Sequence, residues 1–278
     1  MAGTLFVVAT PIGNLGDLSP RAADTLRRVG FIAAEDTRET RKLAEHVGSS
    51  ARLLSLHAHS PRSRFDQCLR LLSEGSDLAF CSDAGTPGVS DPGPALVALA
   101  RSHGMTVVPI PGPSAVHTAL SATGWPADRY VFLGFPPRKG GAREDWLGRI
   151  KESPFPVVCF EAGNRIGQLV ADVARICGGG REIMIGREMT KRFEELRLGR
   201  AEDLGATLQG DSLRGEVTLV VAGAPEGAVR EPEPGLPSTL ARALIRAGME
   251  RSRIAKVVAE VCGLSRNASY RVATEETE

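Results

Sequence analysis

Short apolar runs alternate with amphipathic segments over the first 123 residues, and this alternation limits the possible folds more than any other feature. The runs are continuously apolar, which is typical of strands buried on both faces of a parallel sheet. The predicted strands are Leu5–Ala9, Phe31–Ala34, Leu53–Leu56, Leu78–Cys81 and Thr106–Ile110. The predicted helices are Pro20–Val29, Arg38–Val47, Ser63–Ser73, Pro94–His103 and Ser114–Ala122. The sequence therefore predicts an α/β domain with a parallel sheet over residues 1–123.

A second block follows the Gly124-Trp125-Pro126 turn and has fewer helices for each strand. Its predicted strands are Tyr130–Leu133, Val157–Phe160, Ile183–Ile185 and Val217–Val221, and its predicted helices are Arg143–Lys151 and Arg165–Ile176. This pattern indicates a mixed α+β domain over residues 124–225. A length of 278 residues agrees with roughly two domains at about 150 residues each.

The last part of the chain has a different composition. Residues 226–237 are rich in Gly, Pro and Glu and are predicted to form a linker. Residues 238–278 return to helical periodicity and form a basic tail, because residues 237–272 carry seven Lys and Arg against two Glu. The whole chain has a net charge of only +1, so the positive charge is local.

Several classes of protein are disfavoured by what the sequence lacks. Only 5% of the residues are aromatic, which disfavours nucleic-acid modules that stack bases on aromatic platforms. The five cysteines include no C-x-x-C pair, so we expect no metal site, and an odd number of scattered thiols is typical of a reducing cytoplasm. We expect no signal peptide, because residues 1–10 lack a basic n-region and soon reach Pro11, and no membrane span, because no apolar run approaches the roughly 20 residues required. No dinucleotide-binding or P-loop glycine motif occurs.

Glycine- and proline-rich loops follow three of the predicted strands. They are Thr10–Asn14, Ser82–Gly93 and Pro109–Ala115. Ligands of parallel sheets bind beyond the carboxyl ends of the strands, and small residues let the backbone approach a ligand closely. A purely structural turn is an equal alternative for Thr10–Asn14, whereas the density of special residues in Ser82–Gly93 favours ligand binding. In these loops Asp91 and Ser114 are predicted to cap helices.

Charged side chains follow two further strands. Glu35, Asp36 and Arg38 come after Phe31–Ala34, where one acid is explained by a helix start, with Asp36 or Thr37 as the cap. Arg38 and Arg41 are then candidates for phosphate contacts. His57 follows the strand Leu53–Leu56; metal binding there is disfavoured, because no further ligand set accompanies it.

The whole chain resembles one family, bacterial ribosomal RNA small subunit methyltransferase I, within the tetrapyrrole-methylase-like superfamily. The matching stretches are TPIGNLGDLSPRA, IAAEDTRETRKL, LLSLHAHS, FCSDAGTPGVSDPG, VVPIPGPSA, FLGFPPRKG, IMIGREMTKRFEE and GLSRNASYRVA. The resemblance implies two α/β domains of non-Rossmann type, usually in a homodimer. It also implies transfer of a methyl group from S-adenosylmethionine to the ribose 2′-hydroxyl of a decoding-region cytidine in small-subunit (16S) rRNA or the 30S subunit.

The resemblance assigns the cofactor to loops of both domains. The implied cofactor-binding residues are Pro11, Gly13, Asp83, Ala84, Gly85, Thr86, Val89, Ser90, Ser114, Ala115, Phe160, Glu161, Arg187 and Thr218. One stretch departs from the family pattern: the usual E-S-P-H-R is Glu161-Ala162-Gly163-Asn164-Arg165 here, so any role of the missing Ser, Pro and His is in doubt.

Catalysis and RNA binding are less sharply indicated. Asp36, Glu35 and His57 are the candidate bases for the hydroxyl proton, with Asp36 preferred, and a purely positional mechanism is equally consistent. The predicted RNA contacts are Arg38, Arg41, Arg138, Lys139, Arg143, Arg246, Arg253 and Arg266, although such charges are often only solvated surface. Two alternatives are a methyltransferase acting on a tetrapyrrole-type small molecule, which has no evident need for the basic tail, and a non-catalytic RNA-binding assembly factor.

Overall fold

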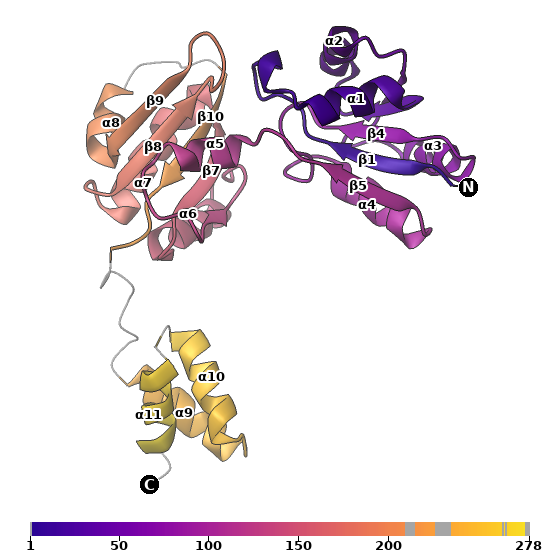
Figure 1. Ribbon diagram of the computed structural model, residues 1–278. Helices are drawn as coiled ribbons and strands as arrows, with labels where there is room; N and C mark the ends of the chain where they lie inside the picture. Colours follow the sequence, from indigo (N-terminus) through magenta and orange to yellow (C-terminus); the bar gives the residue numbers. More distant parts are fainter. Residues whose placement is uncertain (1, 209–214, 226–234, 263, 265, 276–278) are drawn as a thin grey trace.

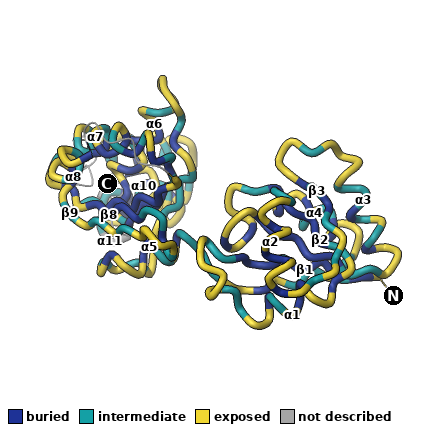
Figure 2. Tube along the Cα trace, turned by 90° about the horizontal axis from the view of Figure 1, so that it is seen from above, coloured by how far each residue is buried: buried dark blue, intermediate teal, exposed yellow. Residues whose placement is uncertain are grey.

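The protein contains two five-stranded sheets and a C-terminal group of three helices (Figure 1). The computed structural model describes residues 2–208, 215–225, 235–262, 264 and 266–275. The buried residues gather along the strands of each sheet, and exposed residues lie on the outer helices and loops (Figure 2). The two-domain α/β architecture predicted from the sequence is therefore confirmed.

The first sheet is fully parallel, with the strand order β3-β2-β4-β1-β5. Its strands are β1 (Thr4–Val8), β2 (Phe31–Ala34), β3 (Arg52–Ser55), β4 (Leu78–Cys81) and β5 (Thr106–Ile110). All five predicted strands are confirmed, each within one residue. The strands β1 and β4 are neighbours in the sheet although they are far apart in the chain, so the loops that follow them emerge side by side at the carboxyl edge.

Helices cover both faces of the first sheet, which explains why its strands are apolar throughout. Helices α1 (Pro20–Arg28) and α2 (Thr37–Val47) pack through Leu26, Leu43 and Val47 on one face. Helices α3 (Arg62–Ser73) and α4 (Gly93–Ser102) pack on the other face through Leu72 and Leu96. A strand in this position has no solvent face on which polar residues could alternate.

The second sheet is mostly antiparallel, with the order β6-β7-β10-β8-β9. Its strands are β6 (Val131–Phe132), β7 (Val157–Ala162), β8 (Glu182–Arg187), β9 (Glu195–Arg200) and β10 (Glu216–Val221). Helices α6 (Gly141–Glu152), α7 (Ile166–Cys177) and α8 (Ala201–Thr207) pack on one face. Strand β9 and helix α8 were not among the predicted elements.

Helix α5 (Ala115–Ser121) packs on the opposite face of the second sheet, through Val116, Ala119 and Leu120. The sequence assigned this helix to the first domain, with a boundary at residue 123. Its apolar contacts with Val158 and Val220 instead place the change of domain before the helix. The Gly-Trp-Pro turn follows the helix and so is not the boundary.

Helices α9 (Leu236–Arg246), α10 (Arg251–Cys262) and α11 (Arg266–Glu275) form the C-terminal group. They pack on one another around a small core that includes Ala241, Ile254, Val258 and Ala273. Helix α9 begins within the predicted linker 226–237, of which residues 226–234 lie outside the described residues. No helix in the described ranges is long and apolar enough to cross a membrane.

Candidate functional site

The loops after β1 and β4 are joined by backbone hydrogen bonds. The N–H of Thr10 donates to the carbonyl of Gly85 (3.0 Å), and the N–H of Gly85 donates back to Thr10 (3.1 Å). The N–H of Asp36 donates to the carboxylate of Asp83 (2.7 Å), which brings in the loop after β2. Three of the predicted strand-end loops are thus assembled at one edge of the sheet, as expected from their positions.

Asp91 organises the glycine-rich loop after β4. Its carboxylate accepts hydrogen bonds from the N–H groups of Gly88 (2.6 Å), Val89 (3.0 Å) and Gly93 (2.7 Å). The last bond satisfies the first N–H of α4, but the N-cap position itself is Pro92, so Asp91 caps the helix from the residue before the N-cap. Gly88, with φ +105°, adopts a conformation that residues with a Cβ rarely adopt.

Thr86 connects this loop to the loop after β5. Its hydroxyl donates to the carbonyl of Pro113 (2.9 Å). In the same loop Ser114 occupies the N-cap position of α5, but its side chain makes no capping hydrogen bond and contacts Nδ1 of His117 (3.0 Å) instead. The predicted capping role of the Ser114 side chain is therefore wrong.

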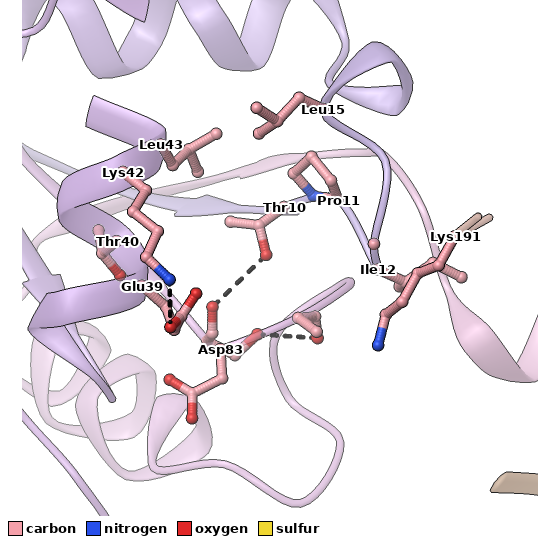
Figure 3. A pocket seen from close by; sticks show the side chains of 13 residues that line it. Thr10, Pro11, Ile12, Leu15, Glu39, Thr40, Lys42, Leu43, Asp83 and Lys191 are labelled. Atoms are coloured by element: carbon pink, nitrogen blue, oxygen red, sulfur yellow. Dashed lines mark hydrogen bonds and ion pairs between the residues drawn. The ribbon is translucent and has the colours of Figure 1, made fainter. Parts of the chain in front are cut away.

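A cavity of about 400 Å³ lies above the assembled loops (Figure 3). Figure 3 shows Thr10 and Asp83 beneath it, Glu39 and Lys42 of α2 on one side and Lys191 on the other. Its lining residues are Thr10, Pro11, Ile12, Gly13, Leu15, Glu39, Thr40, Lys42, Leu43, Ser82, Asp83, Ala84 and Lys191. Four of the predicted cofactor residues, Pro11, Gly13, Asp83 and Ala84, are among them.

A second cavity, of about 120 Å³, continues from the first towards the second sheet. The two cavities share Ile12, Ala84 and Lys191. The other lining residues of the second cavity are Ala115, Phe160, Gly186, Glu188, Met189, Glu216 and Thr218. Residues of both sheets therefore line one cleft, and Ala115, Phe160 and Thr218 lie there as predicted.

Glu161 and Arg187 do not line the cleft. Because successive side chains of a strand point to opposite faces, Phe160 and Glu161 cannot both face it. Strand pairing places Thr218 beside Phe160, whereas Val217 is the partner of both Glu161 and Arg187. Glu161 is buried and ion-paired with Arg165, and Arg187 lies 3.5 Å from Glu195. The resemblance placed Glu161 and Arg187 in the cofactor site, but both lie on the face of the second sheet that α6 and α7 cover.

The remaining cofactor candidates have supporting positions. Gly85 is joined to Thr10 and Thr86 to Pro113, so both residues hold loops together. Val89 and Ser90 are exposed in the loop that Asp91 organises, and neither lines the two cavities.

Residues 188–191 lie over the cleft, and no role was predicted for them from the sequence. Glu188 (φ +48°) and Thr190 (φ +68°) both have left-handed backbone conformations, which non-glycine residues adopt only when the surrounding structure enforces them. The hydroxyl of Thr190 is buried and has no hydrogen-bond partner among the described residues. It lies close to Gly13, where an added Cβ would be 3.0 Å away. The matching stretch IMIGREMTKRFEE was the only signal that could have found this segment.

The three candidate bases have different environments. Asp36 is the N-cap of α2 and is paired with Arg38, whose hydrogen bonds lower the pKa of Asp36 to about 2. Burial, reinforced by the nearby Asp83 charge, raises the pKa of Glu35. His57 is exposed, and its Nδ1 accepts a hydrogen bond from the N–H of His59 (3.2 Å).

The predicted RNA-binding residues do not form one cluster. Arg38 is paired with Asp36, and Arg41 is exposed on α2. Arg143 is mostly buried and ion-paired with Asp172 (2.7 Å), so it is not available for a phosphate. The others described are Arg138, Lys139, Arg246 and Arg253, which are exposed, whereas the side chain of Arg266 lies outside the described residues.

Metal binding finds no support in the described ranges, where no group of three or more His, Cys, Asp or Glu side chains could hold an ion. All five cysteines are free thiols, and four of them are buried.

Comparison with known proteins agrees with the geometry. The family model for tetrapyrrole (corrin/porphyrin) methylases matches residues 4–205. Proteins named ribosomal RNA small subunit methyltransferase I are similar over nearly the whole chain. The one from Micromonospora olivasterospora is 44% identical over 99% of this chain and 89% of its own, and the one from Pseudomonas aeruginosa is 41% identical over 99% and 98%.

Solved structures share the fold at low sequence identity. Uroporphyrin-III C-methyl transferase from Thermus thermophilus, complexed with S-adenyl homocysteine, has a TM-score of 0.58 and 13% identity over 81% of this chain and 100% of its own. Cobalt precorrin-4 methyltransferase has a TM-score of 0.59 and 12% identity over 82% and 96%. The chain therefore belongs to the tetrapyrrole methylase family, in the group whose curated members are named ribosomal RNA small subunit methyltransferase I.

Proposed function

We propose that this chain transfers the methyl group of S-adenosylmethionine to the ribose 2′-hydroxyl of a cytidine in the decoding region of small-subunit rRNA. The observation that carries the proposal is the two-part cleft, in a chain that is 44% identical over 99% of its length to a protein named ribosomal RNA small subunit methyltransferase I. A substrate in the ribosome would place the enzyme in the cytoplasm.

The residues of the cleft fit this methyl donor. The donor carries an adenine, a sulfonium, an ammonium and a carboxylate, so it needs apolar, acidic and basic partners. Ile12, Phe160 and Met189 supply apolar surface, and Lys191 supplies a cation whose Nζ lies 3.0 Å from the Glu188 carboxylate. Asp83 supplies a carboxylate, and Thr190, between two residues that line the cleft, has a buried hydroxyl that no described residue satisfies.

Gly13 supports the fit because its position has no room for a side chain. A Cβ there would approach the Lys191 side chain to 2.4 Å and the Thr190 hydroxyl to 3.0 Å. The glycine therefore lets the loop after β1 pass close beneath the segment at residues 188–191, where a ligand in the cleft would meet both.

The protein's own task is mainly positional. Bound S-adenosylmethionine supplies an electrophilic methyl group for an in-line displacement. The residues of the cleft then hold the acceptor hydroxyl in line and exclude water. Burial raises the pKa of Glu35 towards neutrality, which favours proton transfer. Asp36 is ion-paired with Arg38 and its carboxylate caps the start of α2, so Glu35 replaces it as the preferred base.

Contacts outside the cleft would hold the RNA and a second copy of the chain. Arg38, Arg41, Arg138, Lys139 and the C-terminal arginines are proposed to bind phosphates. A homodimer is supported by Leu196 and Leu198 of β9, which are 47% and 51% exposed. Large apolar side chains on an edge strand are typical of an interface.

The test is a methylation assay on small ribosomal subunits that lack the modification, with the methylated nucleotide mapped. The purified chain should label a decoding-region cytidine at the 2′-oxygen and should not label a tetrapyrrole. Asp83→Asn should weaken cofactor binding, whereas Asp145→Asn, on the exposed surface of α6, should not. Labelling of a tetrapyrrole alone, or failure of S-adenosylmethionine to raise the melting temperature at saturation, would overturn the proposal.

A further inference from the structure

Phe135 is an exposed aromatic residue beside the cleft. Its side chain lies in the loop after β6 and is 46% exposed, and its ring centroid is 5.6 Å from that of Phe160. Phe160 lines the second cavity, so Phe135 lies one ring beyond the cavity wall. The ring therefore packs against a residue of the cavity wall while Phe135 itself stays 46% exposed, which leaves apolar surface next to the cleft for a ligand to cover.

The loop that carries Phe135 is anchored at both ends. The carbonyl of Gly134 accepts a hydrogen bond from the N–H of Phe160 (3.0 Å). The carbonyl of Pro137 accepts one from the guanidinium of Arg143 (2.8 Å), which is itself fixed by Asp172. These bonds, together with two consecutive prolines, hold the loop in one conformation before any ligand binds.

Two cations follow the ring in the same loop. Arg138 and Lys139 are exposed at the edge of a cavity of about 630 Å³, on the other side of β7 from the cleft. The carboxylates of this cavity are already paired: Glu161 binds Arg165, Asp172 binds Arg143 and Glu144 binds Arg175. In the described part of the chain no carboxylate pairs with Arg138 or Lys139, so both can take an anion.

The charges of the cleft indicate where an RNA backbone can run. The charges of Asp83, Asp91 and Glu216 lie close enough to Glu35 to raise its pKa, whereas Lys42 and Lys191 of the cleft are ion-paired with Glu39 and Glu188. This acidic group attracts a cationic donor but repels phosphates. We therefore expect the phosphate next to the acceptor base to lie away from this group, and Arg138 and Lys139 offer a pair of cations on the opposite side of β7 from the cleft.

We propose that residues 134–140 form a reading loop for the acceptor nucleotide. Phe135 stacks on the base, and Arg138 and Lys139 bind the adjacent phosphate. The inference deepens the proposed function and rests on it. Only Pro136 and Pro137 lie between Phe135 and Arg138, so the Cα atoms of Phe135 and Arg138 are at most about 11 Å apart, which suits a base and a neighbouring phosphate of one strand. A base that has left its stack is commonly held by an aromatic ring.

The first test compares two substitutions of Phe135 in the full-length protein. Phe135→Leu removes the ring but keeps an apolar side chain, and Phe135→Trp keeps a stacking surface. With unmethylated small subunits as substrate, Phe135→Leu should lower kcat/KM about 10-fold to 100-fold, while Phe135→Trp should stay within about threefold of the parent. The affinity for S-adenosylmethionine should be unchanged in both, which shows that the fold and the cleft are intact.

The second test removes the cations. Arg138→Gln with Lys139→Gln should raise KM for the subunits with little change in kcat. It should also reduce the slope of log affinity against log salt by about one for each phosphate that the double variant no longer binds. Arg149→Gln, which removes an exposed cation from the end of α6, is the matched control and should change neither quantity.

Two results would overturn the reading loop while leaving the proposed function intact. One is equal kcat/KM for Phe135→Leu and the parent on subunits that the parent methylates. The other is a change of Phe135→Leu from dimer to monomer, with equal kcat/KM for the Leu and Trp variants, which would assign the ring to a contact between copies. A parent protein that binds S-adenosylmethionine but methylates no ribosomal subunit would instead refute the proposed function and the reading loop together.

Discussion

Glu35 and Asp36, neighbouring carboxylates in the loop after β2, have pKa values shifted in opposite directions. Asp36 is paired with Arg38, whereas Glu35 is partly buried beside Asp83. Hydrogen bonds from Arg38 lower the pKa of Asp36 to about 2. Burial and the charge of Asp83 raise the pKa of Glu35, and burial together with the charge of Asp36 raises that of Asp83. A sequence can place an acid at a helix start, and it did so for Asp36. It cannot say which of two adjacent acids turns towards a cation.

The raised pKa of Glu35 predicts a pH-dependent stability. Between the ordinary carboxyl pKa of 4.5 and the raised value, the folded protein binds more protons than the unfolded chain, so the free energy of unfolding falls as pH rises through this window. Glu35→Gln removes that loss. We expect its melting temperature to exceed the parent's by about 1–2 °C at pH 7 and to match it at pH 4.

Differential scanning calorimetry at the two pH values checks this expectation, with Glu45→Gln on the exposed side of α2 as the control. A variant that is less stable than the parent at pH 7 would show that the Glu35 carboxylate is stabilised in the folded protein, which is the opposite of a raised pKa.

Burial also raises the pKa of the Cys81 thiol to about 12 and raises that of Cys159. Because the thiolate is the reactive form, both should resist alkylation in the folded protein. We expect iodoacetamide to modify Cys177, which is only partly buried, before either of them. Peptide mapping after timed alkylation measures the order, and early labelling of Cys81 would contradict it.

At the scale of elements, the predictions succeeded where a segment is buried on both faces. The five strands of the first sheet are continuously apolar, and in short segments bounded by turn residues that pattern is typical of buried strands. Strand β9 was missed because the prediction relied on continuously apolar runs, whereas β9 is an edge strand of alternating charged and apolar residues with Leu196 and Leu198 exposed. Helix α8 was missed because seven residues carry too few turns for a clear period.

Strand register also explains why the resemblance misplaced two residues. A motif places Phe160 and Glu161 together, but the twofold period of a strand separates them onto opposite faces. Of the altered residues, Ala162 is paired with Glu216 and so shares the face of Phe160, whereas Asn164 lines the cavity beside Arg138. None of the altered residues 162–164 is among the residues that line the two cavities of the cleft.

The Arg143–Asp172 pair should stabilise both the second domain and the loop it anchors. Its side chains are 14% and 13% exposed, so removing one charge leaves the other poorly solvated. We expect Asp172→Asn to lower the free energy of unfolding by about 2 kcal/mol. It should also speed tryptic cleavage after Lys139, because Pro137 loses its fixed donor.

Urea denaturation and timed trypsin digestion measure the two effects, and Asp145→Asn on the exposed surface of the same domain is the control. Unchanged stability together with unchanged cleavage would show that the pair does not hold the loop.

For the whole molecule, a net charge of +1 conceals separate regions of opposite sign. Asp83 and Glu216 line the cleft beside the ion pairs Glu39–Lys42 and Glu188–Lys191, and exposed cations lie in the loop at residues 138–139 and on the C-terminal helices. Composition alone disfavoured a nucleic-acid partner, and only the position of the charges changes that interpretation. The positions of these charges depend on strand pairing between distant parts of the chain, such as β1 beside β4. Local sequence patterns do not specify such pairing.

The exposed side chains of β9 predict self-association. Leu198 lies on the same face as α5 and is 51% exposed. We expect the parent chain to be a dimer by light scattering at micromolar concentration, and Leu198→Asp to shift it towards the monomer because the interface would bury an unpaired charge. Arg200→Asp, on an exposed end of the same strand, serves as the control for added charge. A parent that is monomeric at all concentrations would rule out the dimer.

We expect the C-terminal helices to bind RNA and the two sheet domains to bind the cofactor. They have their own core around Ile254 and Val258, and Arg242, Arg246, Arg251 and Arg253 are exposed on them. A chain ending at residue 225 keeps both sheets and the cleft. We expect it to retain the rise in melting temperature with S-adenosylmethionine, and to bind small subunits about 10-fold or more weakly, with a shallower salt dependence. Equal subunit affinity and equal salt slope for the truncated and full-length chains would show that these helices do not hold the RNA.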